Sequence, residues 1–321
     1  MKAVRLHRFG GPEVLQIEEV PEPVPGHGEA LVHVHACGVN FIDVYQRSGA
    51  YQSPLPRGLG LEGAGTVVSL GPGVEGVRVG DRVAWKHTPG SYAERVAVEA
   101  HDLVPIPDGV DFETAAAAML QGMTAHYLSH STFPLQGGQR CIVHAAAGGV
   151  GALLVQMAKK RGAIVFATCS SGKVHIAEAA GADHVIAYDK ADFVEEMKRL
   201  TDGAGVHVVY DSVGKTTFDR SLDCLMVRGT MVLFGQSSGA VPPFDPQILN
   251  RKGGLFLTRP SLAWYTRDRE ELLRRAGDVL GWIASNQLQL RIADVLPMAE
   301  VAEAHRRLEG RRTAGKLLLV P

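Results

Sequence analysis

The chain has 321 residues, of which 45% are hydrophobic and 21% are charged, and its formal net charge at pH 7 is −1. This length allows two ordinary domains, and so small a net charge gives no electrostatic footprint for nucleic acid or for an anionic membrane surface. No window approaches the ~20 apolar residues of a membrane span, and the N-terminal stretch lacks the apolar run of a signal peptide. Four cysteines lie far apart without a C-x-x-C pair, which favours reduced thiols. We therefore expect a cytoplasmic protein with neither a nucleic-acid nor a membrane partner.

Residues 1 to about 112 contain short alternating apolar runs that are separated by glycine and proline. The runs are AVRLHRF (3–9), EALVHVHACGV (29–39), GAGTVVSLG (63–71), DRVAWK (81–86) and ERVAVEA (94–100). Alternation with a period of two predicts strands, and the Pro and Gly clusters predict the turns between them. This part is predicted to be a mostly antiparallel β domain.

The pattern changes at Asp111. Residues 111–130 predict an Ala-rich helix with Asp111 as its N-cap. Strands and helices then alternate: strands are predicted at 163–169, 184–188, 206–214, 230–235 and 254–258, and helices at 172–182, 192–203 and 217–229. Such alternation predicts an α/β fold with a doubly wound parallel sheet that binds its ligand at the carboxyl ends of the strands.

The segment 141–162 opens this alternation and predicts a strand, a tight turn and a helix. Ala146, Gly148 and Gly151 have the spacing of the dinucleotide fingerprint, in which small residues let a pyrophosphate approach the backbone and let the helix pack on the strand. Ala146 departs from the pattern, which has glycine there. Taken alone, the motif also fits an ordinary glycine-rich turn in a chain with 37 glycines.

Two amphipathic segments, 268–287 and 299–310, predict helices near the C-terminus, and an apolar run, Lys316 to Val320, comes after them. We expect this last run to be a strand that returns to the N-terminal domain.

The order of these elements resembles the medium-chain dehydrogenase/reductase superfamily, and within it the quinone oxidoreductase (zeta-crystallin-like) branch. The resemblance runs nearly end to end and is carried by GVNFIDVYQRSGAY (38–51), LPRGLGLEGAGTVV (55–68), LQGMTAHYL (120–128), HAAAGGVG (144–151), VVYDSVG (208–214), FGQSSG (234–239) and TRPSL (258–262). It implies a Rossmann-type NADPH-binding domain over 113–260 and a mostly β, GroES-like catalytic domain over 1–112 and 261–321. The stretch 85–90 departs from the family pattern.

The alcohol dehydrogenases of this superfamily use a catalytic zinc. The resemblance implies that their cysteine ligand corresponds to Asn40 and that their G-H-E triplet corresponds to Gly60, Leu61 and Glu62. Leucine cannot bind a metal, and an amide is a poor substitute for a thiolate. His33 and His35 share one face of a strand, where solvated surface is the expected role. We expect no metal.

A metal-free site suits an acceptor that takes up hydride or electrons readily, such as a quinone or an alkene conjugated to a carbonyl. The resemblance implies an NADPH-dependent quinone reductase with Tyr45 and Tyr51 beside the nicotinamide. A phenol can donate a proton to the acceptor, although either tyrosine would also serve packing.

The cofactor preference is predicted from the residues at the end of the predicted strand 163–169. No Asp or Glu occurs between Gly151 and Glu178, whereas serines and a lysine are present, which favours the 2′-phosphate of NADPH. The resemblance assigns this phosphate to Lys173 and Tyr188, although Lys173 also fits a solvated lysine. It assigns further cofactor contacts to Asn40, Thr124, Ala147, Gly148, Gly149, Val150, Ser170, Ser212, Phe234, Gly235 and Arg311, with Arg312 as the alternative to Arg311.

Two other functions stay open. One is an NADPH-dependent enoyl-thioester or alkenal reductase, and the other is a non-catalytic NADPH-binding structural or RNA-binding protein, which the absence of a basic patch disfavours. The resemblance also implies a homodimer, in which the predicted edge strand 254–258 would pair across a two-fold axis.

Overall fold

The computed structural model describes residues 1–311 and 313–321. The chain folds as two units: unit 1 comprises Met1–Met123 and Thr266–Pro321, and unit 2 comprises Thr124–Tyr265. The first division falls inside helix α2 (Phe112–Tyr127), so a boundary drawn at the change of composition near residue 112 marks the beginning of this helix. None of the described helices is long and apolar enough to cross a membrane.

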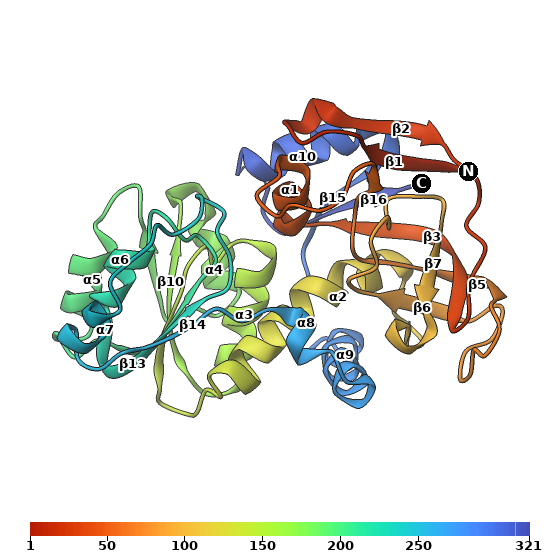
Figure 1. Ribbon diagram of the computed structural model, residues 1–321. Helices are drawn as coiled ribbons and strands as arrows, with labels where there is room; N and C mark the ends of the chain where they lie inside the picture. Colours follow the sequence, from red (N-terminus) through yellow and green to blue (C-terminus); the bar gives the residue numbers. More distant parts are fainter. Residues whose placement is uncertain (312) are drawn as a thin grey trace. The chain divides into compact units, whose positions relative to one another are not determined.

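Unit 1 is built on two sheets whose strands are mostly antiparallel (Figure 1). Its strands are β1 (Lys2–Leu6), β2 (Leu15–Glu19), β3 (Glu29–Val39), β4 (Arg57–Gly58), β5 (Gly63–Leu70), β6 (Arg82–Trp85), β7 (Arg95–Glu99), β8 (Val104–Pro105), β15 (Ile292–Pro297) and β16 (Lys316–Val320). The larger sheet has the order β15-β16-β3-β5-β6-β8, with β7 also pairing with β3, and the smaller has the order β2-β1-β4. The alternating runs of the N-terminal part therefore form strands as predicted.

The C-terminal strand returns to the N-terminal part of the chain, as expected. β16 pairs antiparallel with β3, so that Leu318 lies opposite Gly38, and β16 also pairs parallel with β15, a strand that the sequence analysis missed. The helices of unit 1 are α1 (Phe41–Ser48), most of α2, α9 (Arg269–Ala284), α10 (Val301–Glu309) and the 3-10 turns Pro12–Val14, Ala100–Asp102 and Met298–Glu300. The Asp111 carboxylate accepts the Thr114 N–H at 2.6 Å, which confirms the predicted N-cap of α2.

Unit 2 contains a six-stranded, fully parallel sheet of order β11-β10-β9-β12-β13-β14. The strands are β9 (Arg140–Val143), β10 (Ile164–Cys169), β11 (His184–Ala187), β12 (Val206–Asp211), β13 (Leu225–Leu233) and β14 (Phe256–Thr258). The helices are α3 (Gly149–Lys160), α4 (Val174–Ala179), α5 (Phe193–Leu200), α6 (Phe218–Leu222), α7 (Gln247–Arg251) and α8 (Leu262–Tyr265), with a π-helical turn at Leu128–Thr132 and a 3-10 turn at Ser171–Lys173.

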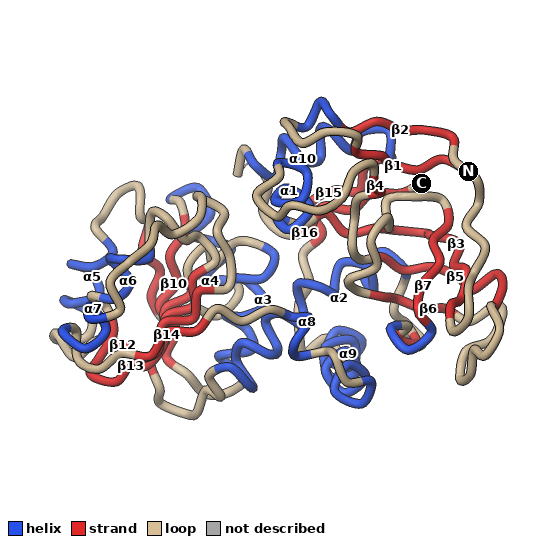
Figure 2. The backbone as a smooth tube through the Cα atoms, viewed as in Figure 1, coloured by secondary structure: helices blue, strands red, loops and turns tan. Residues whose placement is uncertain are grey.

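The chain starts this sheet in the middle and extends it to both sides, which confirms the doubly wound α/β fold. Helices cover both faces: Figure 2 shows α5, α6 and α7 on one side of the strands and α3 on the other. Apolar side chains of α5 and α6, including Phe193 and Phe218, pack on one face of the sheet with Ile142 and Val209.

One predicted element of unit 2 is wrong. The helix expected over 217–229 ends at Leu222, and β13 begins at Leu225 instead of residue 230. Leu225 pairs with Val206, and the register then shifts because β13 contains a bulge in which Arg228 has a φ of 60°. Helical spacing of the apolar residues in this segment concealed the bulged strand.

Candidate active site

The loop between β9 and α3 carries the fingerprint residues. Its backbone turns at Ala145, whose φ is 51°, so the left-handed position lies one residue before Ala146. This explains why the loop tolerates alanine at position 146. A Cβ added at Gly151 would lie 2.3 Å from the Ala145 carbonyl oxygen, so only glycine lets α3 approach the loop this closely.

The backbone at the start of α3 offers free donors. Gly148 is the N-cap, and the first intrahelical bond runs from the Ala152 N–H to the Gly148 carbonyl at 2.9 Å. The N–H groups of Gly149 and Val150 precede this bond and have no acceptor within the helix. Ala147 is buried beside them. A helix N-terminus with such donors fits a pyrophosphate.

A second group of predicted residues lies where β10 and β11 end. The two strands are parallel with Cys169 opposite Ala187, and the Tyr188 N–H donates to the Cys169 carbonyl at 3.1 Å. Ser170 and Lys173 follow β10, and Tyr188, whose side chain is 47% exposed, follows β11. The structure therefore brings Ser170, Lys173 and Tyr188 together at the carboxyl ends of β10 and β11, where Rossmann-type sheets hold the adenosine ribose.

The ends of β12 and β13 form a third group. Asp211 is fully buried, and its carboxylate accepts the Val213 and Gly214 N–H groups at 2.7 and 3.1 Å. A Cβ added at Gly235 would lie 2.6 Å from the Ser212 carbonyl oxygen, so the two backbones touch. The Asp211 carbonyl also accepts the Phe234 N–H at 2.8 Å, so Asp211 fixes both loops that carry the three predicted contacts here, which are Ser212, Phe234 and Gly235.

The remaining predicted cofactor contacts lie elsewhere. Thr124 is buried on α2, in unit 2. Arg311 follows α10 in unit 1, is exposed and has a φ of 55°. Arg312, its alternative, lies outside the described residues.

Both candidate proton donors are associated with α1. Tyr45 lies on this helix, and Tyr51 follows it, with its N–H donating to the Tyr45 carbonyl at 3.0 Å. The two rings meet edge to face, with centroids 5.2 Å apart. Tyr51 is 37% exposed, and Tyr45 is partly buried. The structure therefore brings the two phenols together as one aromatic pair.

Asn40, at the N-cap of α1, belongs to a buried charged group that the sequence analysis missed. Lys316 donates to the Asn40 side-chain oxygen at 2.7 Å and forms an ion pair with Glu62. The Asn40 amide donates in turn to Glu62 at 2.7 Å. Asn40, Glu62 and Lys316 are at most 4% exposed. We call these three residues the Lys316 network.

Two further contacts complete the Lys316 network. The second carboxylate oxygen of Glu62 accepts the Leu120 N–H from α2 at 2.6 Å. A Cβ added at Gly38 would lie 2.0 Å from a Glu62 carboxylate oxygen, so any larger residue there would displace the Glu62 carboxylate. The only sign of this group in the sequence is a lysine that opens an otherwise apolar strand.

Asp43 holds the same end of α1. Its carboxylate accepts the Asn40 N–H and the Tyr92 hydroxyl, each at 2.8 Å, and completes a capping box with Asn40. Burial raises the pKa of Asp43 to about 7, although both hydrogen bonds and the Lys316 charge act in the opposite direction. Asp43 and Glu62 thus fix the backbone of unit 1.

Arg47 holds the other end of α1. Its guanidinium is 2% exposed and bonds both carboxylate oxygens of Glu309 on α10, at 2.8 and 2.7 Å. A ring nitrogen of His305 lies 3.2 Å from the same guanidinium. Burial, together with the Arg47 charge, lowers the pKa of His305 to about 3, so this imidazole is neutral. The helix that carries Tyr45 is therefore fixed at both ends.

The residues in the position of the zinc ligands do not fit a metal. Glu62 is bonded to Lys316, which already balances its charge, and Asn40 is bonded to both. Across residues 1–311 and 313–321 there is no cluster of three or more His, Cys, Asp or Glu side chains that could hold a metal ion. His33 and His35 are exposed, as expected, and His35 stacks on Phe112 at 4.1 Å.

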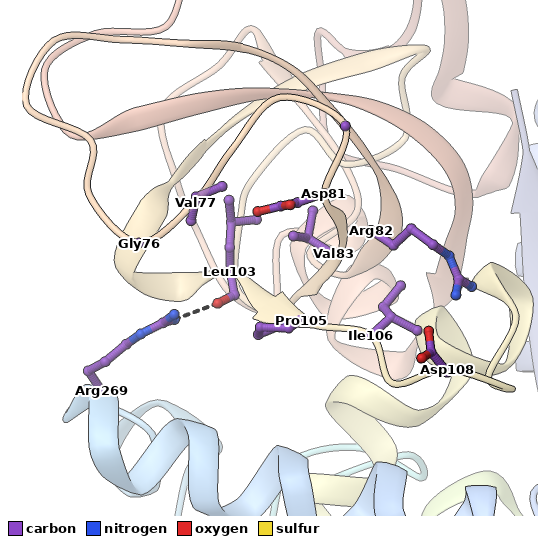
Figure 3. Close-up of a pocket in the computed structure, with 11 residues that line it drawn as sticks. Gly76, Val77, Asp81, Arg82, Val83, Leu103, Pro105, Ile106, Asp108 and Arg269 are labelled. Atoms are coloured by element: carbon purple, nitrogen blue, oxygen red, sulfur yellow. Dashed lines mark hydrogen bonds between the residues drawn. The ribbon is translucent and has the colours of Figure 1, made fainter.

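Unit 1 also contains a cavity of about 340 Å³ (Figure 3). Arg269, at the start of α9, donates to the Leu103 carbonyl at its edge, and Asp81, Arg82 and Asp108 add charges to the lining. None of the predicted site residues lines it, so we assign it no part in the site.

Comparison with known proteins places these features in context. Residues 26–108 match the family described as "Alcohol dehydrogenase GroES-like domain", and residues 149–270 match "Zinc-binding dehydrogenase". The chain is 43% identical to a quinone oxidoreductase from Pseudomonas aeruginosa, over 100% of this chain and 99% of the relative, and 38% identical to a 2-haloacrylate reductase from a Burkholderia species, over 99% and 98%. A crystal structure of Escherichia coli quinone oxidoreductase complexed with NADPH superposes with a TM-score of 0.98 at 43% identity and covers 100% of both chains.

Replacing Lys316 by methionine leaves the Glu62 carboxylate buried without its cation. We expect Lys316→Met to lower the free energy of unfolding by about 3–5 kcal/mol, measured by urea denaturation. The double variant Glu62→Gln/Lys316→Met removes both charges and should recover at least half of this loss. The exposed Lys198→Met is the matched control and should change stability by less than about 0.5 kcal/mol. A loss below about 1 kcal/mol for Lys316→Met would contradict the network's role.

Asp43 predicts a distinct dependence of stability on pH. Because its folded pKa of about 7 lies above the unfolded value of about 3.9, the folded state holds the extra proton between these two values. Relative to Asp43→Asn, the wild-type free energy of unfolding should therefore fall by up to about 1.4 kcal/mol per pH unit between pH 5 and 7, and the difference should level off above pH 7. Urea unfolding of both proteins from pH 5 to 8 tests this. A difference that stays constant, or changes in the opposite direction, excludes a raised pKa at Asp43.

Proposed function

The chain belongs to the quinone oxidoreductase family of the medium-chain dehydrogenases/reductases, and from this premise we propose that it reduces quinones with NADPH and without a metal. The observation that carries the proposal is the full-length match to a structure complexed with NADPH, together with strand ends that present the predicted binding residues. When bound, NADPH supplies the reducing equivalents, as hydride or as electrons. Every other part of the reaction falls to the side chains and amides of this chain.

The charges and backbone donors of unit 2 support this use of the cofactor. The Gly149 and Val150 amides at the start of α3 would hold the pyrophosphate. Lys173, with Ser170 and Tyr188, would hold the 2′-phosphate, because an ammonium is attracted by the negative charge of this phosphate, which the ribose hydroxyl of NADH lacks. The close approach of Gly235 to Ser212 leaves backbone groups to border the cofactor beyond the ends of β12 and β13.

The reduced acceptor needs a proton, and Tyr45 and Tyr51 are the donors that we propose. A phenol is a competent general acid, and its oxygen can donate a hydrogen bond to an acceptor oxygen that gains negative charge. Asp43 and Arg47 fix the helix that carries Tyr45, which fixes the backbone from which that phenol extends. Asn40, whose side-chain amide is held by Glu62 and Lys316, would lie near the cofactor.

Reduction of an activated alkene is the second candidate function. The 2-haloacrylate reductase that matches 99% of the chain is named for a conjugated alkene, and such an alkene needs the same hydride and proton as a quinone. A non-catalytic structural or RNA-binding role is disfavoured by these matches, and the formal charge of −1 further disfavours RNA binding.

We also propose that the protein is a cytoplasmic homodimer with no nucleic-acid or membrane partner. The four cysteines are free and buried, which suits a reducing compartment. Strand β14 lies at the edge of the unit 2 sheet, and two large apolar residues beside this edge are exposed, Phe256 at 60% and Val227 at 68%. A second copy pairing across a two-fold axis would cover them.

Steady-state oxidation of NADPH and NADH with small quinones, large quinones and crotonyl-type thioesters tests the function. We expect NADPH with quinones to be the fastest combination. In the same assay Lys173→Ala should raise the KM for NADPH by about 10- to 100-fold, which is the value of a charge-assisted hydrogen bond. The KM for NADH should change much less. An equal loss for both cofactors would refute the role of Lys173, and turnover with thioesters alone would move the chain to the enoyl reductases.

The proton donor can be identified by removing one hydroxyl at a time. Tyr45→Phe and Tyr51→Phe keep the aromatic pair, so the variant that lacks the donor should lose at least about tenfold in kcat while it binds NADPH as before. Stopped-flow turnover and fluorescence titration of NADPH give the two values. Unchanged kcat in both variants would show that neither phenol donates the proton.

The oligomeric state tests the proposed interface. Phe256→Asp should convert a dimer to a monomer in sedimentation velocity, because it places a charge on the covered edge. Val79→Asp, at an apolar residue of unit 1 that is 61% exposed, is the matched control and should leave the dimer intact. A wild-type monomer, or a Phe256→Asp dimer, would rule out this interface.

A further inference from the structure

The ends of β10 and β11 hold a carboxylate that the sequence window after the fingerprint does not contain. The Asp189 carboxylate accepts the Ser171 N–H at 2.7 Å and the Ser171 hydroxyl at 2.7 Å, one with each oxygen. Asp189 follows Tyr188 directly, and Ser171 lies between Ser170 and Lys173 in the sequence. A negative charge is therefore bonded to the segment that we propose to bind the 2′-phosphate.

The topology of the sheet explains how the carboxylate reaches this place. Ser171 and Asp189 are 18 positions apart, but β10 and β11 are parallel neighbours with Cys169 opposite Ala187. Residues that follow the two strands consequently meet at the carboxyl end of the sheet. In an NAD-type site an acidic residue at the end of the second strand binds the ribose 2′-hydroxyl, and here the third strand supplies the acid.

Asp189 and Lys173 act on the same strand end with opposite charges. Burial raises the pKa of the Cys169 thiol, the last residue of β10, and the Asp189 charge raises it further, whereas the Lys173 charge lowers it. The hydrogen bonds from Ser171 lower the pKa of Asp189, so this carboxylate is ionised at neutral pH. A cation that attracts a phosphate and an anion that repels it thus both lie near the end of β10.

We propose that Asp189 is a specificity-determining residue, whose carboxylate occupies the two donors of Ser171 and weakens the preference of this site for a 2′-phosphate over a 2′-hydroxyl. A phosphate group carries a charge of about −1.5 to −2, so a carboxylate beside it costs affinity, whereas a ribose hydroxyl can donate to the same carboxylate. The chain consequently discriminates between NADPH and NADH less than Lys173 alone would dictate. This inference rests on the proposed use of NADPH.

Binding of two cofactor fragments tests the inference without turnover. Isothermal titration calorimetry at low ionic strength, where surface charges are least screened, gives Kd for 2′,5′-ADP and for 5′-AMP. In Asp189→Asn the ratio of the two Kd values should shift by about three- to tenfold in favour of 2′,5′-ADP. Asp189→Ala, which removes the hydrogen bonds as well as the charge, should shift it in the same direction. Glu178→Gln removes one negative charge from the exposed side of α4 and is the matched control, with a shift below about twofold.

Other results would contradict the role of Asp189 or the proposed use of NADPH. Equal weakening of both fragments in the Asp189 variants would show that Asp189 only orders the Ser171 segment. An equal shift of the Kd ratio in Glu178→Gln would show that any nearby negative charge has this effect, whether or not it is bonded to Ser171. A wild-type preference for 2′,5′-ADP that is unchanged in Asp189→Asn refutes this inference alone. A wild-type preference for 5′-AMP refutes the proposed cofactor as well.

Discussion

A single buried ammonium, that of Lys316, connects parts of unit 1 that are far apart in the sequence. It contacts Asn40 at the start of α1 and Glu62 just before β5, and Glu62 holds the backbone of α2 at Leu120. Removing two charges from water costs several kcal/mol for each ion. The attraction between the two buried charges offsets this cost only when their remaining hydrogen-bonding groups are also satisfied. The Asn40 amide and the Leu120 N–H satisfy them, so the network is stable only as a whole.

The rigidity of α1 results from this network and from two neighbours. Asp43 and Asn40 fix its first turn, and Arg47 fixes its last turn to Glu309. A short helix has little stability of its own, so tertiary contacts determine where its side chains lie. In this protein those contacts place the Tyr45 and Tyr51 rings edge to face. The candidate chemistry therefore depends on residues that would not touch a substrate.

Local pattern was sufficient to predict much of the fold. The parallel sheet and the Asp111 cap agree with periodicity, turn residues and helix signals that lie within a few positions of one another. The expected return of β16 is confirmed as well, although its pairing with β3 joins residues far apart in the sequence. The bulge of β13 was not predictable in this way, because pairing with β12 and not the local spacing makes residues 225–229 extended. Strand β15 was missed for a similar reason, since half of it is exposed and only its pairing with β16 defines it.

The candidate site shows the same division. Small residues of the fingerprint and the lysine after β10 are visible in the sequence because their spacing is short. Lys316 and Asp189 are not, because their partners lie 254 and 18 positions away and only strand pairing brings them together. The sequence between Gly151 and Glu178 does not contain Asp189, which follows the next strand, β11. Non-local electrostatics is thus the part of the site that local pattern could not predict.

The position of β16 has a consequence for how the chain folds as it is synthesised. Unit 2 is one continuous segment, so all of its strands can pair once Tyr265 has left the ribosome. Unit 1 cannot close in this way, because β16 lies inside its larger sheet, between β15 and β3. Until residues 316–320 emerge, the edge of β3 stays open and Glu62 has no counter-charge. The earliest-made strands of the protein therefore belong to the unit that completes its fold last.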